Sequence, residues 1–274
     1  MKKDNSLIGR FESITELHAY LQNAETAEQF KGRCASFDGD EEFTKSLNME
    51  QADDWLLHGQ PEIVVKIEQS LASMAAADGV KDATATTRTT VRSVAGNKLN
   101  MAAYMAGEAR CMYRTVRVPI KRPVINVVYN SGATAQYSAA EIVDAAFKVL
   151  YALIRIEKTG IRTNLYAATI SEKSGQFGGI LLRVKDAEQP FNVLKTAYPL
   201  CHASMLRRHK FRYIETQKAA KSGWVYGYGR SVDIHGLKES LQGILQYDCC
   251  ITFYDTRHMT VEDIVEYILH NGQE

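Results

Sequence analysis

The sequence lacks the features that mark membrane proteins and secreted, disulfide-rich domains. No apolar run reaches the roughly 18 residues of a membrane span, so we expect none. Its five cysteines are scattered and odd in number, with no Cys-x-x-Cys pair, which favours reduced, buried thiols. No apolar signal core follows the basic start at Met1. These absences predict a cytoplasmic protein with no membrane partner.

The sequence also lacks the common catalytic and nucleotide-binding motifs. Gly-x-Gly-x-x-Gly, Gly-x-x-x-x-Gly-Lys-Ser/Thr and Gly-x-Ser-x-Gly are all absent. His202 and His209 have no carboxylate spaced with them, and Cys249 and Cys250, adjacent in a strand, would point to opposite faces. We therefore predict no catalytic residue, no metal and no cofactor. Enzymatic activity stays open, and its absence is favoured.

The clearest pattern in the chain occupies residues 123–170. Val124–Val128 is a short valine-rich run, typical of a strand buried on both faces. Ser138 and Glu141 form a capping box that opens a long apolar helix ending near Lys158. Ile161–Ile170 reads as a second strand. Strand, helix and strand in this order predict a βαβ crossover between parallel strands.

Strands and helices continue to alternate after this unit. A strand is predicted at 178–184, a second at 249–254, and helices at 234–245 and from Thr260 to the end. Phe211–Ile214 is a weaker strand candidate, and 224–229 fits an edge strand or a loop against the sheet. The alternation predicts an α/β fold: a doubly wound, mostly parallel sheet with helices on both faces, over residues 98–274.

Two other segments precede this α/β unit. Residues 1–75 carry helical caps at Ser13 and Asn48 and predict a helical N-terminal segment. Residues 76–97 are rich in Ala and Thr with few large apolar side chains, which predicts a flexible linker or loop. A further strand is predicted at 115–120, running into the central unit.

Polar residues follow the predicted strands at the edge where α/β sheets bind ligands. We expect partner binding at these strand ends through Asn130, Ser131, Thr134 and Asp255. As a nucleophile Ser131 has no supporting motif, and a turn or cap residue is the favoured interpretation.

Charge is segregated although the formal net charge of the 274-residue chain is only +1. Residues 201–230 have a balance of +6, and residues 38–54 a balance of −6. The basic segment predicts contact with nucleic-acid phosphates, with aromatic rings as stacking surfaces. Two alternatives stay open: the two segments meet each other, or each is a solvated face. The candidate nucleic-acid-binding residues are Arg207, Arg208, Lys210, Arg212, Trp224 and Arg230.

Several stretches resemble a family of uncharacterised bacteriophage and prophage proteins. The resemblance rests on FTKSLNMEQADDWLLHGQPE from Phe43, on YMAGEARCMYR from Tyr104, on residues 115–170, and on a block from Met205 to Glu215. The match departs at Lys45 and Ser46, where the family has Gly-Thr. The resemblance implies a viral protein in the host cytoplasm and no molecular activity.

The core also resembles a von Willebrand factor A domain, a fold often used to bind protein partners. Those domains hold a divalent cation with Asp-x-Ser-x-Ser, where this chain has Tyr129, Ser131 and Ala133. Because a hard cation needs carboxylate charge, no functional cation site is expected. Together the resemblances imply a non-enzymatic module that binds a protein partner or a second copy of itself, with nucleic-acid binding through residues 207–230 as the alternative.

Overall fold

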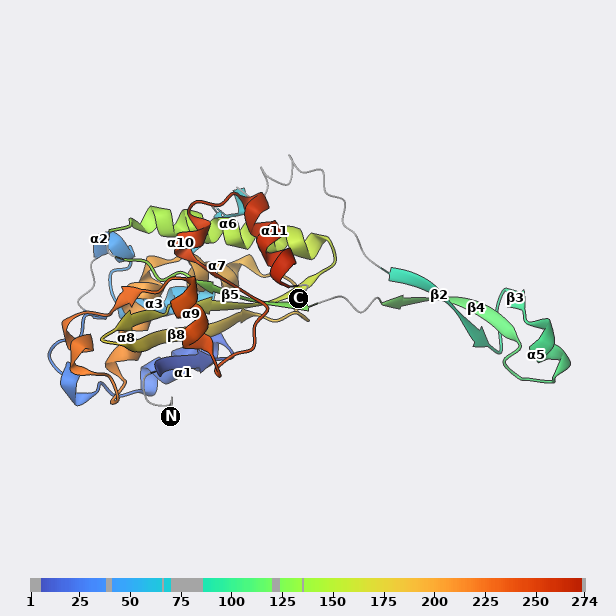
Figure 1. The fold of residues 1–274 in the computed structure, drawn as a ribbon, viewed down its shortest axis with the longest axis horizontal. Helices are drawn as coiled ribbons and strands as arrows, with labels where there is room; N and C mark the ends of the chain where they lie inside the picture. The colour runs from blue at the N-terminus through green and yellow to red at the C-terminus, as the bar shows by residue number, and fades with distance from the viewer. Residues whose placement is uncertain are drawn as a thin grey trace.

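A seven-stranded mixed sheet forms the centre of the computed structural model, which describes residues 6–37, 41–65, 67–69, 86–119, 124–134 and 136–272. The valine-rich strand β5 (Val124–Asn130) lies between β10 (Cys249–Thr252) and β6 (Arg162–Ala168) and is parallel to both. Helix α6 (Ala139–Lys158) joins β5 to β6, so the predicted βαβ crossover is confirmed (Figure 1).

The other strand pairs of the sheet are mostly antiparallel. Strand β8 (Gln176–Lys185) runs antiparallel to β6 and to β7 (Ser171–Lys173), and β9 (Arg230–Ser231) runs antiparallel to β7. The prediction of a mostly parallel sheet is therefore wrong. The cause is local: Ser174 and Gly175 both have positive φ, 53° and 68°, and make a two-residue hairpin turn where a parallel connection needs a crossover.

Helices cover the two faces of the sheet unequally. Helices α6, α7 (Val193–Cys201) and α11 (Val261–Asn271) pack on one face, whereas α9 (Ile234–Leu241) packs on the other (Figure 1). Cys249 and Cys250 belong to the cores on opposite faces, as their adjacency in a strand predicts. The coarse prediction of an α/β sandwich is confirmed. Helix α10 (Phe253–Thr256) follows β10 directly and shortens the predicted strand.

The N-terminal segment contributes to this same sheet. Strand β1 (Ser6–Phe11) pairs in parallel with β8 along its whole length. The predicted helices are present as α1 (Ile14–Asn23) and α3 (Met49–His58), with Ser13 and Asn48 as their caps. Short helices η1 (Glu28–Phe30) and α2 (Glu41–Thr44) lie between them, and residues 61–65 and 67–69 are helical.

A largely helical stretch connects α7 to β9. It holds a π-helical turn, η2 (Met205–His209), then α8 (Lys210–Glu215) and the 3-10 helix η3 (Ser222–Tyr226). The strand predicted at Phe211–Ile214 is therefore wrong. Residues 224–229, for which an edge strand or a loop was open, are the end of η3 and an irregular segment that leads into β9. Buried positions at 206, 210 and 214 recur at helical spacing, so the chain from Met205 continues as one helical face.

Residues 86–119 form a separate three-stranded antiparallel sheet, called the arm below. Strand β2 (Thr86–Ser93) pairs with β4 (Met112–Pro119), which also pairs with β3 (Lys98–Leu99); α5 (Met101–Met105) lies at the end (Figure 1). Part of the predicted linker is thus a strand, because its threonines favour β structure; residues 76–85 lie outside the described residues. The strand predicted at 115–120 pairs within the arm and not with β5.

Candidate anion-binding cleft

A cleft of about 620 Å³ opens beside the loop that follows β5. Its walls come from that loop, from the helical turn at 206–211, from the 227–230 segment and from Phe43. Three of its lining residues are cationic, and none of the described lining residues is acidic. Its polar and aromatic lining residues include Thr134, Arg207, Lys210, Phe211, Tyr228 and Arg230.

Lys210 is the unusual group in this cleft. Lys210 is the first residue of α8 and is 4% exposed. No described residue gives its ammonium a hydrogen bond or an ion pair. Burial, and secondly the charge of Arg207, lower the pKa of Lys210 to about 7. The ammonium itself reaches the cleft, and because a poorly solvated charge without a partner is costly, this position favours a bound anion.

Aromatic rings hold Arg207 at the cleft. Its guanidinium carbon lies 4.9 Å from the centre of the Phe43 ring and 5.6 Å from that of Phe211. Phe211 in turn stacks on Tyr228, with ring centres 3.7 Å apart and an angle of 11°. Such cation–π contacts orient an arginine without neutralising its charge. Arg207 therefore stays available to an anion.

The Tyr228 wall is fixed by a buried carboxylate. The Tyr228 hydroxyl donates to Glu215 Oε1 at 2.5 Å, and the Ser36 N–H donates to the same oxygen at 3.0 Å. Glu215 is fully buried. Next to Tyr228, Gly229 has φ +83°, and a Cβ there would lie 2.8 Å from the Glu172 carbonyl oxygen. A side chain at 229 would therefore displace this wall.

Of the four predicted strand-end residues, one lines the cleft. Thr134 does so, and its Oγ1 accepts from the Tyr254 hydroxyl at 3.4 Å. Asn130 is buried and bonds the backbone of Ile170, its Oδ1 accepting at 2.9 Å. Ser131 is buried beneath the loop, and Asp255 caps α10 by accepting from the Thr252 N–H at 2.8 Å. These last three hold the strand ends in place.

The six predicted phosphate-contacting residues divide into two groups. Arg207, Lys210 and Arg230 line the cleft. Arg208, Arg212 and Trp224 are buried with internal partners, so they are not available to an external ligand. Arg208 donates to Ser36 and Ser46, Arg212 to Ala24 and Thr26, and Trp224 to Gln176.

The predicted acidic and basic segments meet at these buried groups. Asp53 Oδ1 lies 3.1 Å from His209 Nε2, and Arg208 Nε donates to Ser46 Oγ at 2.6 Å. This supports the alternative in which the two segments contact each other; Asp38 and Asp40 lie outside the described residues. The contact also brings Phe43 to the cleft. Phe43 is uncharged, so the distribution of charge along the sequence does not predict its place there.

Comparison with known families places the whole arrangement in one group. A family model matches residues 2–259, which include the cleft, the sheet and the arm. The chain belongs to the family described as Domain of unknown function (DUF7192). No curated protein and no solved structure matches it. The description of DUF7192 names no activity, so the cleft is the feature of this chain that bears on function.

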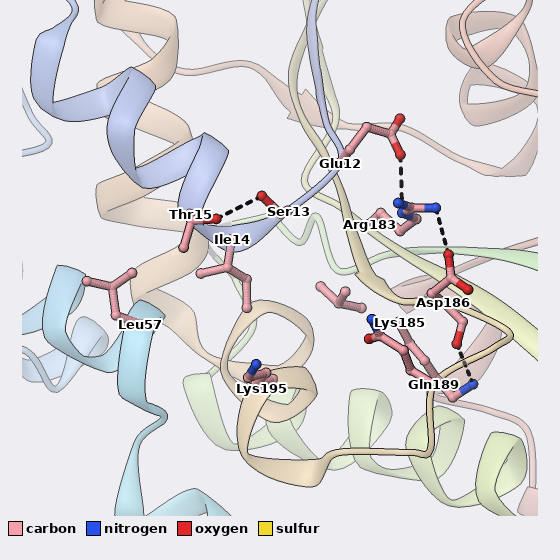
Figure 2. A pocket seen from close by; sticks show the side chains of 11 residues that line it. Glu12, Ser13, Ile14, Thr15, Leu57, Arg183, Lys185, Asp186, Gln189 and Lys195 are labelled. Carbon is pink, nitrogen blue, oxygen red and sulfur yellow. Dashed lines mark hydrogen bonds and ion pairs between the residues drawn. The ribbon is translucent and has the colours of Figure 1, made fainter.

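A second cleft, of about 280 Å³, lies at the other end of the sheet (Figure 2). Most of its charged groups neutralise one another: Arg183 bridges Glu12 at 3.1 Å and Asp186 at 2.8 Å. Lys185 pairs with the buried carboxylate of Glu157, and Lys195 is an exposed cation of the lining. A site with most of its charges paired offers less to an anionic ligand, so the cleft at Lys210 is the stronger candidate.

Neither a metal-ligand cluster nor a helix suited to a membrane span occurs among the described residues. No group of three or more His, Cys, Asp or Glu side chains is arranged to hold a metal ion among them. Within the same ranges, no helix is both long and apolar enough to cross a membrane. The thiols of Cys201, Cys249 and Cys250 are buried and free, and burial raises the pKa of Cys201 to about 12.

Proposed function

We propose that the protein binds a phosphate-bearing ligand of nucleotide size in the cleft beside β5. The observation that carries the proposal is Lys210: its side chain is almost wholly buried, and its ammonium reaches the cleft with no anionic partner among the described residues. An anion in the cleft would offset the cost of burying this charge.

The shape and donors of the cleft favour phosphate. Its volume of about 620 Å³ lies in the usual range for small-ligand sites. Arg207 and Arg230 present planar guanidinium groups, which bind phosphate oxygens in pairs, and Lys210 adds a compact charge. Thr134 supplies a hydroxyl on the opposite wall. The cleft also lies beyond the carboxyl end of a parallel strand, where α/β sheets bind ligands.

Calorimetric titration with ATP, with inorganic pyrophosphate and with uncharged adenosine tests this function. We expect ATP and pyrophosphate to bind and adenosine to fail. Lys210→Met and Arg207→Gln are each expected to weaken binding by about tenfold or more, the loss of one charge-assisted contact. Lys218→Met is the matched control, because Lys218 is exposed and does not line the cleft. Equal affinity in the Lys210 variant and its control would contradict the proposal.

Binding is also expected to depend on pH. The anion binds best to the protonated amine, and the pKa of Lys210 in the free protein is about 7. Affinity should therefore fall as pH rises above about 7, by up to tenfold per unit until the higher pKa of the complex is reached. A pyrophosphate affinity that is constant across this range would remove Lys210 from the site.

Binding of a protein partner, in the phage or prophage setting that the resemblance implies, is a second proposal. Its support is two exposed aromatic side chains, Phe37 at 53% and Tyr226 at 77% exposure; Tyr226 precedes the cleft-lining Gly227 in sequence. The parallel group β10–β5–β6 is compatible with a von Willebrand A-like core, although the sheet as a whole is mixed. If the partner is a second copy, Phe37→Ser with Tyr226→Ser should lower the solution mass in sedimentation; a monomeric wild type would exclude that partner.

A further inference from the structure

The arm carries a charge opposite to that of the rest of the chain. Residues 86–119 contain six Lys or Arg and one acidic residue, Glu108, a balance of +5. Because the whole chain has a formal charge of +1, the remainder carries −4. This separation of charge gives the arm its own electrostatic character, independent of the cleft.

The described cations of the arm face solvent. Arg92, Lys98, Arg110 and Arg114 are all exposed. Glu108 pairs with Arg92, with 2.9 Å between Nη1 and Oε2. None of the other residues that the structure describes gives Lys98, Arg110 or Arg114 an acidic partner. At least three positive charges of the arm are thus available to an anionic surface.

The arm also exposes apolar side chains at its end. Met101 is 60% exposed, Tyr104 59% and Met105 78%, and Ala103 is the arm's one buried apolar residue among those described. The arm therefore has almost no core of its own. An isolated small sheet of this kind is marginally stable, and it gains stability when a partner covers it.

The dimensions of the arm suit a nucleic-acid groove. Its two long strands have eight residues each, a length of about 26 Å at the usual rise per residue. A two-stranded ribbon fits the major groove of B-DNA, which is about 12 Å wide. Thr90 and Thr115, both exposed in these strands, add hydroxyl donors of the kind that contact phosphates.

We propose that the arm is a β-ribbon that binds duplex DNA through its major groove. Lys98, Arg110 and Arg114 lie against phosphates, and Met101, Tyr104 and Met105 lie against base edges in the groove. The proposal does not depend on the phosphate-ligand cleft, since no residue of the arm lines that cleft.

DNA fits the arm better than a protein surface does. The cores of protein interfaces are depleted of charge, whereas here Lys98 and Arg110 flank the exposed apolar residues in sequence. Arm-to-arm pairing of two copies would bring two segments of +5 together and is opposed by repulsion. A polyanion neutralises these charges without such a cost.

Fluorescence anisotropy with a labelled 30-base-pair duplex, at about 50 mM and about 200 mM salt, tests the proposal. The arm variant is Lys98→Gln, Arg110→Gln, Arg114→Gln in the full chain. The control variant removes three exposed cations of the body by Lys195→Gln, Lys218→Gln and Lys238→Gln. The arm variant should lose about tenfold or more in affinity, and its salt slope should shrink by about two to three, since each phosphate contact contributes roughly 0.9. The control variant should match the wild type.

Three outcomes would overturn the proposal. The first is equal loss in the arm and control variants, which would indicate a diffuse charge effect. The second is equal binding of the duplex and of its separated strand, which would exclude a groove. The third is a wild-type protein that does not bind DNA but self-associates, together with a Met101→Ser, Met105→Ser variant that is monomeric. The arm would then bind a second copy of the chain. Because the cleft variant Lys210→Met leaves the arm intact, it should bind the duplex normally, which separates the two proposals.

Discussion

The ammonium of Lys185 lies 2.5 Å from the carboxylate of Glu157, and the two side chains are 2% and 9% exposed. Lys185 comes from β8 and Glu157 from α6, so the pair ties a helix to the sheet beneath it. Thr163, in β6, completes the cluster: its carbonyl oxygen accepts from Lys185, and its hydroxyl donates to Glu157 at 2.8 Å. The buried charges of Lys185 and Glu157 are therefore compensated only while both side chains are present.

Removing one member of this pair should cost more than the pair contributes. Lys185→Met leaves the Glu157 carboxylate buried without its cation, and we expect a loss of about 3 to 5 kcal/mol in the free energy of unfolding. Lys148→Met is the control, because the Lys148–Asp144 pair is looser, at 3.8 Å, with Asp144 exposed; about 0.5 kcal/mol is expected there. Urea denaturation measures both. Similar losses in the two variants would show that burial of the Lys185 pair is unimportant.

How far the sequence predicts this fold depends on how local each signal is. The capping box at Ser138 and the apolar run from Val124 act within one element, and both predictions are confirmed. Strand direction beyond β6 depends on a two-residue turn at Ser174 and Gly175, a weak signal beside the strong alternation of strands and helices. Residues 86–97 of the arm fall within the predicted linker or loop, because low hydrophobicity is shared by flexible segments and by strands that lack a core.

The candidate site shows the same limit. A cluster of Arg and Lys in sequence marks a basic segment, but it does not say which side chains turn inward. Arg208 is fully buried because Ser36 and Ser46, distant in sequence, supply its acceptors. Its neighbour Arg207 faces the cleft because Phe43 and Phe211 support its guanidinium. The two residues are distinguished by contacts from Ser36, Phe43 and Ser46, which are distant in sequence.

Lys210→Met should stabilise the protein while it weakens anion binding. The pKa of Lys210 is lowered to about 7 in the folded chain, against an ordinary value near 10.5, because burial disfavours the ammonium. The unfolded chain thus binds the extra proton first, so the cost to folding is fully present below about pH 7 and disappears as pH rises above about 10.5. We expect a gain of about 2 kcal/mol near neutral pH and almost none above about pH 10.5.

Urea denaturation of wild type and Lys210→Met at about pH 6.5 and about pH 10.5 measures this difference. Lys218→Met controls for the loss of one surface charge and should change stability little at either pH. A variant less stable than the wild type near neutral pH would mean that an anion-independent contact holds Lys210, contrary to its lack of a described partner.

His202 should make the protein sensitive to acid. Burial, and secondly the neighbouring His209, lower the pKa of His202 to about 3. Its Nδ1 accepts from the Ser204 N–H at 3.1 Å, and its ring stacks on Tyr198. In the unfolded chain the imidazole takes up a proton near pH 6.5, whereas the folded chain keeps it neutral. Stability is therefore fully present above about pH 6.5 and falls as pH drops toward 3.

His202→Gln keeps an acceptor for Ser204 and removes this titration. The variant should be less stable than the wild type near pH 7 by about 1 to 2 kcal/mol, from lost packing. The difference should narrow, by roughly 1 kcal/mol per unit, as pH falls from about 6 to about 4. Thermal unfolding across this range measures it, with exposed His235→Gln as the control. A difference that stays constant with pH would show that His202 does not resist protonation.

Arg208→Lys should lower the Tm of the protein more than Arg207→Lys does. The Arg208 guanidinium donates to three acceptors, Ser46 Oγ and Ser46 O at 2.6 Å and Ser36 O at 3.3 Å, in an arrangement that a single ammonium lacks the geometry to reproduce. Leaving buried acceptors unpaired costs about 1 to 3 kcal/mol each, so we expect Tm to fall by roughly 5 to 10 °C. Arg207→Lys keeps a cation over the same rings and should change Tm by less than about 2 °C. Calorimetry of the two variants decides the point: equal shifts would mean that the buried network around Ser46 contributes no more to stability than the cation–π contacts at the cleft surface.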